Sequence, residues 1–448
     1  MTLMVSISGI RGVFGSDLTP GNLTLYASAF GTWLKGGTVV VGRDSRVTGE
    51  LCERVVTAAL QSTGCDVINL GIVPTPTVAM GVLKHRAAGG IIISASHNPA
   101  EWNALKLLNH KSEFLDNDQG DEMINIARNH RIHNCDYRAI GKVYRDETVV
   151  EAHINAILNL PYINREQIAS ADFNVMLDCV NGAGSHAIPR LLERLGVRQI
   201  TKIHCVPDGL FPHNPEPLPE HLGEICERIV QDGSDIGFVT DPDADRLAIV
   251  DEHGKLLGEE YTQAIAFDFM LKKKAGPVAT NLSSSRVTDD IARKYDQTCH
   301  RTAVGEIHVV KEMQRVGAVI GGEGNGGVIN PDLHYGRDAL VGIAMVLQYL
   351  AEERKTPSQV RAEMPDYVIQ KSKVLLENLD ADAVLRTVAE TCVNQDINTT
   401  DGVKIDFPEG WVHLRKSNTE PIIRIYSEAQ TSEKAEELTS FVKKMIPS

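Results

Sequence analysis

Residues 89–99 read GGIIISASHNP and decide how the first part of the chain folds. Three successive isoleucines after two glycines predict a buried strand. The strand must end by Pro99, because proline cannot donate a hydrogen bond to a ladder. It therefore delivers the hydroxyl of Ser96 to a loop, with His97 beside it and the amine of Lys106 ten residues further on. A serine in a loop is most often a turn former, so this stretch alone assigns no chemistry.

The segments before this strand alternate between strand and helix. Residues 39–41 predict a strand, 51–60 a helix with one apolar face, and 65–68 the next strand. This order is typical of a wound α/β domain, in which ligands bind at the ends of the strands. Asp44 and Arg46 follow the first of these strands, and we expect them to fix loops.

Length and composition limit the class of protein. A chain of 448 residues is too long for one core and predicts three or four domains. The net charge of −14 argues against nucleic acid and anionic membrane as partners. The apolar runs have only strand length, and the N-terminus lacks the pattern of a signal peptide, so we expect a cytoplasmic protein. Eight cysteines stand singly, without the spacing of a zinc site or a disulfide framework.

A predicted strand at 235–239 is followed by the loop DPDADR, residues 241–246. Its three carboxylates at alternate positions would repel one another, so the loop predicts a hard, oxygen-ligated cation such as Mg²⁺. A helix-flanked calcium loop is the rival interpretation, since Glu252 also falls at its ligand spacing. That interpretation fails because Arg246 occupies the glycine position and strands flank the loop.

The loop GGEGNGG, residues 321–327, resembles a glycine-rich phosphate loop, but no GK[ST] follows and no helix begins there. Dinucleotide and P-loop interpretations therefore fail. One carboxylate and one amide among glycines suit hydrogen bonds to sugar hydroxyls. His308, which stands before a predicted helix, is interpreted as a surface residue.

Two further segments carry basic side chains. The turn 415–421 contains arginine, lysine and two hydroxyls, which together can form an anion nest, although such a turn is otherwise a solvated hairpin. Arg424 follows in the next predicted strand. Near the N-terminus, Arg11 lies between two glycines and is expected to project from a loop toward a phosphate.

Four of these segments resemble one family. SASHNP resembles the phosphoserine loop of the α-D-phosphohexomutases, the family of phosphoglucomutase, phosphomannomutase and phosphoglucosamine mutase. DPDADR is similar to the family's metal loop, and 415–421 to its phosphate-binding loop. GEGNGG corresponds to the sugar loop, usually GEMSGH or GEQSGH; Glu323 matches, whereas Asn325 replaces serine and Gly327 replaces histidine. The motifs span the chain in the family order.

The resemblance implies a role for each candidate residue. Ser96 would carry a phosphoryl group, one oxygen of which would join Asp241, Asp243 and Asp245 around one Mg²⁺ per chain. Lys106 and Arg11 are the candidates for general acid and base, although an arginine can hardly lose its proton. The remaining candidates steady the phosphoryl group (His97 and Arg246), read the sugar hydroxyls (Glu323 and Asn325) or hold the distal phosphate (Arg415, Ser417, Asn418, Thr419 and Arg424).

The implied fold is α/β, with three related mixed α/β domains and a smaller α+β domain around a central cleft. We place these domains at residues 1–148, 149–253, 254–365 and 366–448.

The implied activity is that of an isomerase which interconverts hexose 1- and 6-phosphates through a hexose 1,6-bisphosphate, acting on small phosphosugars as a monomer or homodimer. The sugar loop favours phosphoglucosamine mutase, with phosphomannomutase/phosphoglucomutase as the alternative. A metal-dependent sugar phosphatase would use the same serine and aspartates but release inorganic phosphate. A non-catalytic phosphosugar-binding protein would bind without turnover.

Overall fold

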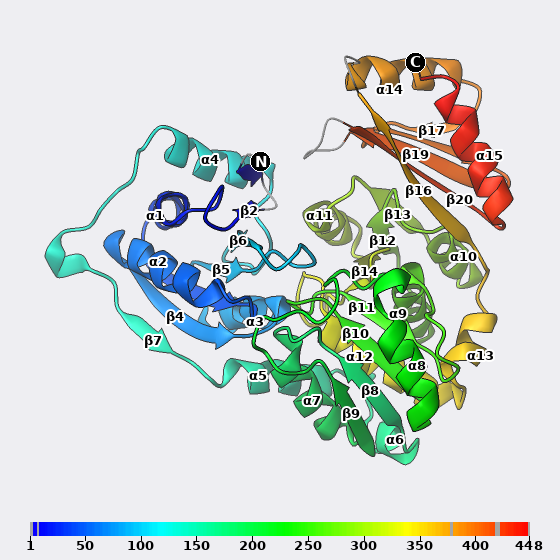
Figure 1. Ribbon diagram of the computed structural model, residues 1–448, viewed down its shortest axis with the longest axis horizontal. Helices are drawn as coiled ribbons and strands as arrows, with labels where there is room; N and C mark the ends of the chain where they lie inside the picture. Colours follow the sequence, from blue (N-terminus) through cyan, green and yellow to red (C-terminus); the bar gives the residue numbers. More distant parts are fainter. Residues whose placement is uncertain (1–2, 7–8, 377–379, 417–421, 447–448) are drawn as a thin grey trace.

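The structure is a computed structural model that describes residues 3–6, 9–376, 380–416 and 422–446. Its strands form four sheets, and we name the parts built around them domains I to IV in chain order. Domain I lies on one side of the molecule and domain IV on the other, with domains II and III joining them (Figure 1). No described helix has the length and apolar content needed to cross a membrane.

Domain I is built on a seven-stranded sheet, ordered β1-β2-β6-β5-β3-β4-β7. The strands are β1 (Met4–Ser6), β2 (Gly9–Val13), β3 (Gly37–Arg43), β4 (Cys65–Ile72), β5 (Gly89–Ile93), β6 (Trp102–Leu108) and β7 (Val143–Arg145). The helices are α1 (Pro20–Leu34), α2 (Gly49–Ser62), α3 (Thr75–His85) and α4 (Asn117–Arg128). Strands β5, β3, β4 and β7 are parallel, and β6 pairs antiparallel with β5.

The three isoleucines of β5 are explained by the helices that cover both faces of the sheet. Ile91 and Ile93 pack in one cluster with α1, α2 and α4, whereas Ile92 packs on the opposite face with α3. Successive side chains of a strand point to opposite faces, so a sheet covered on both faces needs apolar residues at every position. The buried strand predicted before the Ser96 loop is confirmed as β5.

Domains II and III repeat the core of this sheet with four strands each. Domain II contains β8 (Asn174–Asp178), β9 (Gln199–Ile203), β10 (Ile236–Thr240) and β11 (Leu247–Val250), with α5 (Val149–Leu158), α6 (Arg165–Ser170), α7 (Gly184–Leu195) and α8 (Gly223–Asp232). Domain III contains β12 (Val278–Asn281), β13 (Cys299–Thr302), β14 (Ile320–Glu323) and β15 (Gly327–Ile329), with α9 (Glu259–Lys273), α10 (Val287–Lys294), α11 (Glu306–Val316), α12 (Ala339–Glu353) and α13 (Pro357–Ala362).

The three sheets share one strand order. In each, a central strand (β3, β8 or β12) has a parallel neighbour on both sides, and the third strand of the set (β5, β10 or β14) pairs with an antiparallel fourth (β6, β11 or β15). The loop between the third and fourth strands therefore occupies the same place in each domain. The three predicted functional loops, at 94–101, 241–246 and 324–326, all fall there.

Domain IV is a five-stranded antiparallel sheet, ordered β16-β20-β19-β18-β17, with α14 and α15 packed in its core. It packs on domain III: Nη2 of Arg286 donates to the carbonyls of Phe407 (2.9 Å) and Gly410 (2.7 Å). Its elements are β16 (Val368–Leu375), α14 (Ala381–Thr391), β17 (Asp396–Asn398), β18 (Val403–Phe407), β19 (Gly410–Lys416), β20 (Ile422–Ala429) and α15 (Ser432–Lys443).

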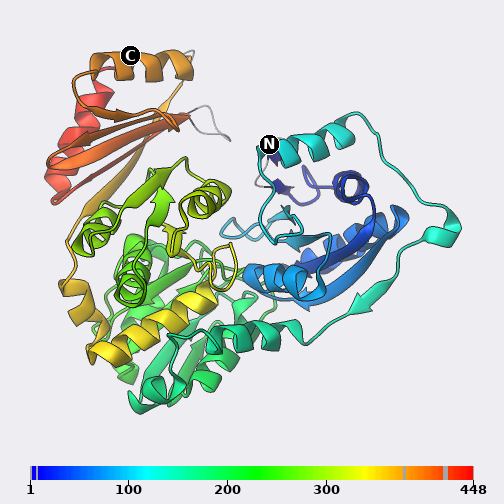
Figure 2. The same ribbon diagram turned by 180° about the vertical axis from the view of Figure 1, so that it is seen from behind.

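The predicted fold class, three mixed α/β domains and a smaller antiparallel C-terminal domain, is confirmed. Domains II and III share a single apolar cluster that runs from α5 to the end of α13. Seen from behind, α12 (yellow) lies across the boundary between domains II and III (Figure 2), where it packs against α6 and α9. The exact limits placed at 148, 253 and 365 stay a prediction.

Candidate active site

The three loops meet at one cavity of about 330 Å³. It lies where domains I, II and III converge. Because each loop ends the same strand of its sheet, the packing of three similar domains is enough to bring together residues far apart in the sequence. The lining residues are Ser6, Arg11, Ser96, His97, Lys106, Phe114, Arg246, Val304, Gly305, Glu306, Ile307, His308, Glu323, Asn325 and Arg337.

Ser96 is held in a sharp turn. Its φ of 51° is left-handed, its N–H donates to Oγ of Ser94 (2.9 Å), and its own hydroxyl donates to Oδ2 of Asp241 (2.6 Å). Beneath the loop, the buried guanidinium of Arg46 donates to the carbonyls of Ser96, Asn98 and Pro99, each at 2.6 Å. Three charge-assisted hydrogen bonds fix the loop backbone, as predicted for Arg46.

The acidic loop gathers three fully buried carboxylates. Ligand oxygens of Asp241, Asp243 and Asp245 lie within 4.8 Å of one another. Within the described residues, one oxygen each of Asp243 and Asp245 has no hydrogen-bond partner. Buried carboxylate oxygens require compensation, and an all-oxygen cluster is the donor set of Mg²⁺. The residues present therefore fit that ion.

Lys106 neutralises part of this cluster. Its Nζ lies 2.6 Å from Oδ2 of Asp243 and 3.6 Å from Oδ2 of Asp245. Burial would lower the pKa of Lys106, but the two carboxylates outweigh burial and raise it, so the amine is protonated. Burial raises the pKa of Asp241 well above its usual value, with Asp245 and Asp243 adding to the effect. For Asp243 the burial effect is outweighed by Lys106, which holds its pKa below the usual value.

Models of the four domains of the phosphoglucomutase/phosphomannomutase family match this chain in order. Domain I matches residues 4–132, domain II 151–254, domain III 258–367 and the C-terminal domain 359–445. A phosphoglucomutase/phosphomannomutase of Thermococcus kodakarensis is 38% identical, and the match covers 96% of this chain and 95% of that protein. The chain belongs to the α-D-phosphohexomutase family. It is a phosphohexomutase, an isomerase of sugar phosphates.

Other similar proteins carry several names. A probable phosphoglucosamine mutase of Methanopyrus kandleri is 35% identical over 96% of this chain and 95% of its own. A phosphoglucomutase/phosphomannomutase family protein of Burkholderia thailandensis shares the fold, with a TM-score of 0.85 at 23% identity over 99% and 97% of the chains. An Aspergillus fumigatus N-acetylphosphoglucosamine mutase, solved with GlcNAc-6P and magnesium, has a TM-score of 0.59 at 15% identity over 99% and 95% of the chains.

Arg337 is the main residue of this phosphohexomutase that the sequence did not reveal. Its guanidinium pairs with three carboxylates: Asp245 (2.7 Å), Glu306 (2.8 Å) and Glu323 (3.0 Å). It thus ties the acidic loop to the sugar loop. Glu323 also accepts from Nδ2 of Asn281 (3.0 Å) and from the N–H of Gly305 (3.2 Å).

Glu306 was also missed. Burial raises the pKa of this carboxyl to about 7; Arg337 opposes the rise, while Asp245 and Glu323 add to it. A carboxyl with this pKa exchanges its proton near neutral pH, as proton transfer requires. The glycine before Glu306 (Gly305, φ 131°) is a local sign of a turn. The charged residues that face Glu306 are far away in the sequence, so no local pattern indicates them.

The other predicted residues of domains I to III also line the cavity. Nη1 of Arg11 donates to Oδ1 of Asn98 (2.6 Å), and burial, opposed by Asp243, lowers the pKa of Arg11. The loop predicted around Arg11 is wrong: the residue lies in β2, which pairs antiparallel with β6. Nδ1 of His97 lies 3.5 Å from Oγ of Ser96, and burial, then Arg246, lowers the pKa of His97, which is therefore neutral.

The sugar loop contains one buried polar atom whose hydrogen-bonding capacity is unused. Oδ1 of Asn325 is buried and, within the residues the structure describes, without a hydrogen-bond partner. His308, interpreted as a surface residue, is partly exposed and lines the cavity from the first turn of α11. This position results from the packing of α11 in domain III against domain I. No local sequence pattern predicts that packing.

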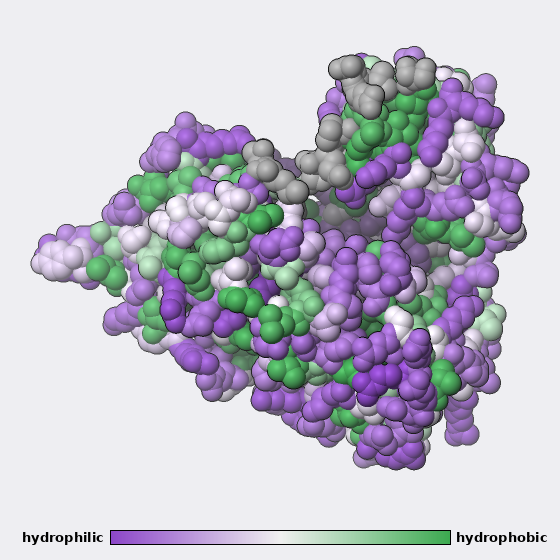
Figure 3. Space-filling model, in the orientation of Figure 1, coloured by the Kyte–Doolittle hydropathy of each residue, from purple (hydrophilic) through white to green (hydrophobic). Residues whose placement is uncertain are grey.

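None of the described residues of domain IV lines this cavity. Arg415 and Arg424 lie directly opposite each other across β19 and β20, and Nε of Arg415 lies 3.5 Å from Oδ2 of Asp401. Neither arginine lines the cavity. Figure 3 shows a hollow between domains I and IV at this side of the molecule. The predicted phosphate ligands Ser417, Asn418 and Thr419 lie outside the described residues.

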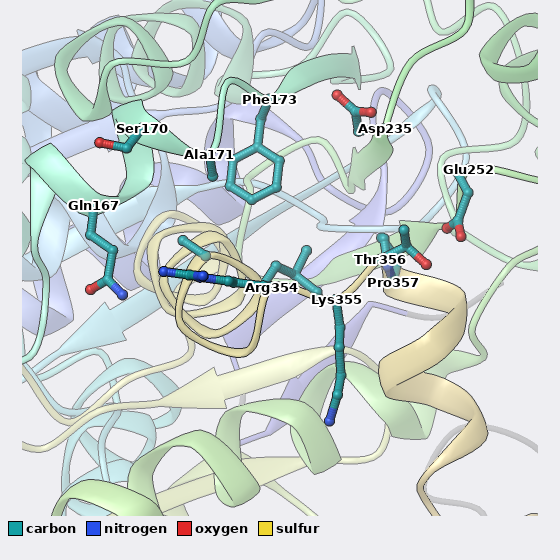
Figure 4. Close-up of a pocket in the computed structure, with 12 residues that line it drawn as sticks. Gln167, Ser170, Ala171, Phe173, Asp235, Glu252, Arg354, Lys355, Thr356 and Pro357 are labelled. Carbon is teal, nitrogen blue, oxygen red and sulfur yellow. The ribbon is translucent and has the colours of Figure 1, made fainter.

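A second cavity, of about 550 Å³, shares no lining residue with the first. Figure 4 shows Phe173, Arg354 and Glu252 around it. The oxygens of Glu252 accept from the N–H (3.2 Å) and the hydroxyl (2.5 Å) of Ser358. Glu252 is therefore engaged away from the three aspartates, which removes the helix-flanked calcium loop as an interpretation.

Proposed function

We propose that this phosphohexomutase interconverts glucosamine 6-phosphate and glucosamine 1-phosphate through a phosphoserine at Ser96. The observation that carries the proposal is the position of the Ser96 hydroxyl, which opens to the cavity and touches the acidic loop at 2.6 Å. The same hydroxyl can be the donor and the acceptor of one phosphoryl group. This requires only that a sugar phosphate present each of its two ends in turn.

The reaction consists of two transfers. The P–O bond to Oγ of Ser96 breaks while a P–O bond to the free sugar hydroxyl forms, which gives a hexose 1,6-bisphosphate. The proton of that hydroxyl passes to a base in the cavity. The bisphosphate then turns over, its other phosphoryl group returns to Ser96, and the proton is restored to the oxygen left on the sugar. Free hexose 1,6-bisphosphate would restore the phosphoserine if it were lost.

Three groups are available for the proton. Lys106 is protonated and buried beside the acidic loop, so it can donate to a leaving oxygen. Glu306 has a pKa near neutrality and can accept. Arg11 is suited to hold phosphoryl oxygens, because a guanidinium keeps its proton. His97 and Arg246, which also line the cavity, would steady the phosphoryl group.

Asp241, Asp243, Asp245 and a phosphoserine oxygen would hold one Mg²⁺ per chain. When bound, the ion neutralises charge that develops on the transferred phosphoryl group. The two carboxylate oxygens without partners are the support for this assignment.

The sugar would be read by Glu323 and Asn325. Arg337 fixes the carboxylate of Glu323, while Oδ1 of Asn325 keeps its capacity to accept a hydrogen bond. An amino group on the sugar would meet the carboxylates of Glu306 and Glu323, and this favours glucosamine. Arg415 and Arg424, with Ser417, Asn418 and Thr419, would take the distal phosphate once the substrate spans the hollow toward domain IV.

One observation favours a second substrate class. The relative at 38% identity is named phosphoglucomutase/phosphomannomutase, whereas several at 32–35% are named probable phosphoglucosamine mutase. The test is kcat/KM on glucosamine, mannose and glucose 1-phosphates with Mg²⁺ and a bisphosphate activator. We expect a preference for glucosamine phosphate of about tenfold or more, equal to about 1.4 kcal/mol in the transition state. Equal or higher values for mannose or glucose phosphate would refute the glucosamine assignment.

Assembly as a monomer or homodimer is part of the same proposal. Domains I to III of one chain supply the lining residues of the described cavity, and this supports a single chain as the active unit. Sedimentation at several protein concentrations, with activity measured in parallel, tests whether one chain suffices.

A further inference from the structure

A second cluster of metal-ligating side chains lies in domain II, outside the cavity. Asp178 ends β8, His204 follows the neighbouring strand β9, and His213 lies in the connection from β9 to α8. Nδ1 of His204 lies 2.9 Å and Nε2 of His213 lies 3.1 Å from the same oxygen, Oδ2 of Asp178. The three ligand atoms all lie within 4.8 Å of one another.

We propose that Asp178, His204 and His213 form a binding site for a divalent transition-metal ion of the Zn²⁺ class. Two imidazoles and a carboxylate are a common zinc ligand set. With Zn–N and Zn–O bonds of about 2.0–2.1 Å, ligands of a tetrahedral ion lie about 3.3 Å apart. The two distances from Oδ2 of Asp178 to the imidazole nitrogens, 2.9 and 3.1 Å, are within a few tenths of an ångström of this value. A water molecule would complete the coordination on the exposed side.

The groups around the cluster are arranged as they are around metal-bound histidines. A ligating imidazole usually gives its second N–H to a carbonyl or carboxylate, which fixes the ring. Nδ1 of His213 lies 2.8 Å from the carbonyl of Asn214, and Nε2 of His204 lies 3.3 Å from Oε2 of Glu224. Oδ1 of Asp178 accepts the N–H of Val180 (2.8 Å), which leaves Oδ2 for the ion.

The surroundings of both rings support the same conclusion. Both ring nitrogens of His213 lie near acceptor oxygens, and so do both of His204. A metal ion would bind the inner nitrogen of each ring, beside Asp178, while the outer nitrogens keep their neighbours.

The cluster would fasten a loop that supports the catalytic serine. Phe211, two residues before His213, packs under Arg46 with its ring centroid 5.0 Å from the guanidinium carbon. Arg46 in turn holds the carbonyl of Ser96. The hydroxyl of Ser45 in domain I donates a hydrogen bond to the backbone carbonyl of Asn181, which lies near Asp178 (2.7 Å). A metal here would therefore brace the contact between domains I and II.

The test uses the full-length protein freed of metal with a chelator and then supplied with excess Mg²⁺ to fill the acidic loop. Zn²⁺ titrated into it by calorimetry should bind with one equivalent per chain. His213→Ala should weaken this binding at least tenfold. His221→Ala is the matched control, because this nearby imidazole also meets a backbone carbonyl (2.9 Å) but has no carboxylate partner among the described residues. It should bind Zn²⁺ like the natural protein.

Asp243→Asn should also keep the Zn²⁺ equivalent, which separates this site from the acidic loop. X-ray absorption of the zinc-loaded natural protein needs no variant to fold, and it should show two imidazoles and oxygen ligands. Absence of Zn²⁺ binding, unchanged binding in His213→Ala, or sulfur ligands would each overturn the proposal. Sulfur ligands would assign the metal to the cysteines instead.

Discussion

The hydroxyl of Ser96 lies 2.6 Å from Oδ2 of Asp241, although 145 residues separate the two in the chain. The contact joins the loop after β5 in domain I to the loop after β10 in domain II. Both loops follow the third strand of their sheets, so the repeated strand order, rather than a local motif, makes the contact. A phosphoryl group on Ser96 would thus be formed against the cation site.

Arg46→Lys should lower kcat by about tenfold to a hundredfold while KM changes little. Lysine cannot reach the three loop carbonyls that the fork of Arg46 holds at 2.6 Å, so Ser96 loses its fixed position. Steady-state kinetics measure the effect. Arg54→Lys is the control, since that side chain is 75% exposed and pairs with Glu50 in the same helix; it should behave like the natural enzyme.

Arg337→Ala should destabilise the protein by about 3–5 kcal/mol, because three buried carboxylates lose their shared cation. Urea unfolding measures the change. Arg315→Ala removes an exposed arginine that pairs with Glu312 in the same helix and should cost less than about 1 kcal/mol. Equal, small effects of the two substitutions would show that Arg337 does not connect the loops.

The Glu306 carboxyl should make stability depend on pH. Its pKa is raised from 4.5 to about 7 in the folded protein, so the folded state holds more protons than the unfolded state between these values. The contribution of Glu306 to the free energy of unfolding is fully present below pH 4.5. As the pH rises toward 7, about 3 kcal/mol of it is lost. The difference in unfolding free energy between the natural protein and Glu306→Gln should fall accordingly across this range. A flat difference would contradict the raised pKa.

Removal of divalent metal should abolish turnover, and Mg²⁺ should restore it. Asp243→Asn should weaken Mg²⁺ binding, because it removes the negative charge of a carboxylate that has one oxygen without a hydrogen-bond partner. Glu252→Gln should leave Mg²⁺ affinity unchanged, because Glu252 binds Ser358 in the second cavity. Calorimetric titration of both variants decides. Loss of affinity in the Glu252 variant would support the calcium-loop interpretation, in which Glu252 is a metal ligand.

The sequence was most informative where one chain segment holds both the strand and the functional group. The isoleucines before Ser96 and the strands around Asp241 are of this kind, because strand period and loop chemistry are local properties. Arg337 and Glu306 could not be found this way, since their importance comes from partners in other loops. The sequence of β16 does not indicate a strand clearly, because its alternation includes lysines and a glutamine, and the strand is half exposed at the edge of its sheet.

The central claim is that Ser96 gives its phosphoryl group to the sugar and takes one back. The most direct measurement loads the enzyme with a radioactive phosphoryl group, adds unlabelled glucosamine 6-phosphate with Mg²⁺, and follows the label in a single turnover. The account predicts that label leaves Ser96 and appears in the bisphosphate and monophosphate sugars, and that Ser96→Ala takes up no label. Label released as inorganic phosphate, or label that stays on the protein while the sugar isomerises, would contradict it.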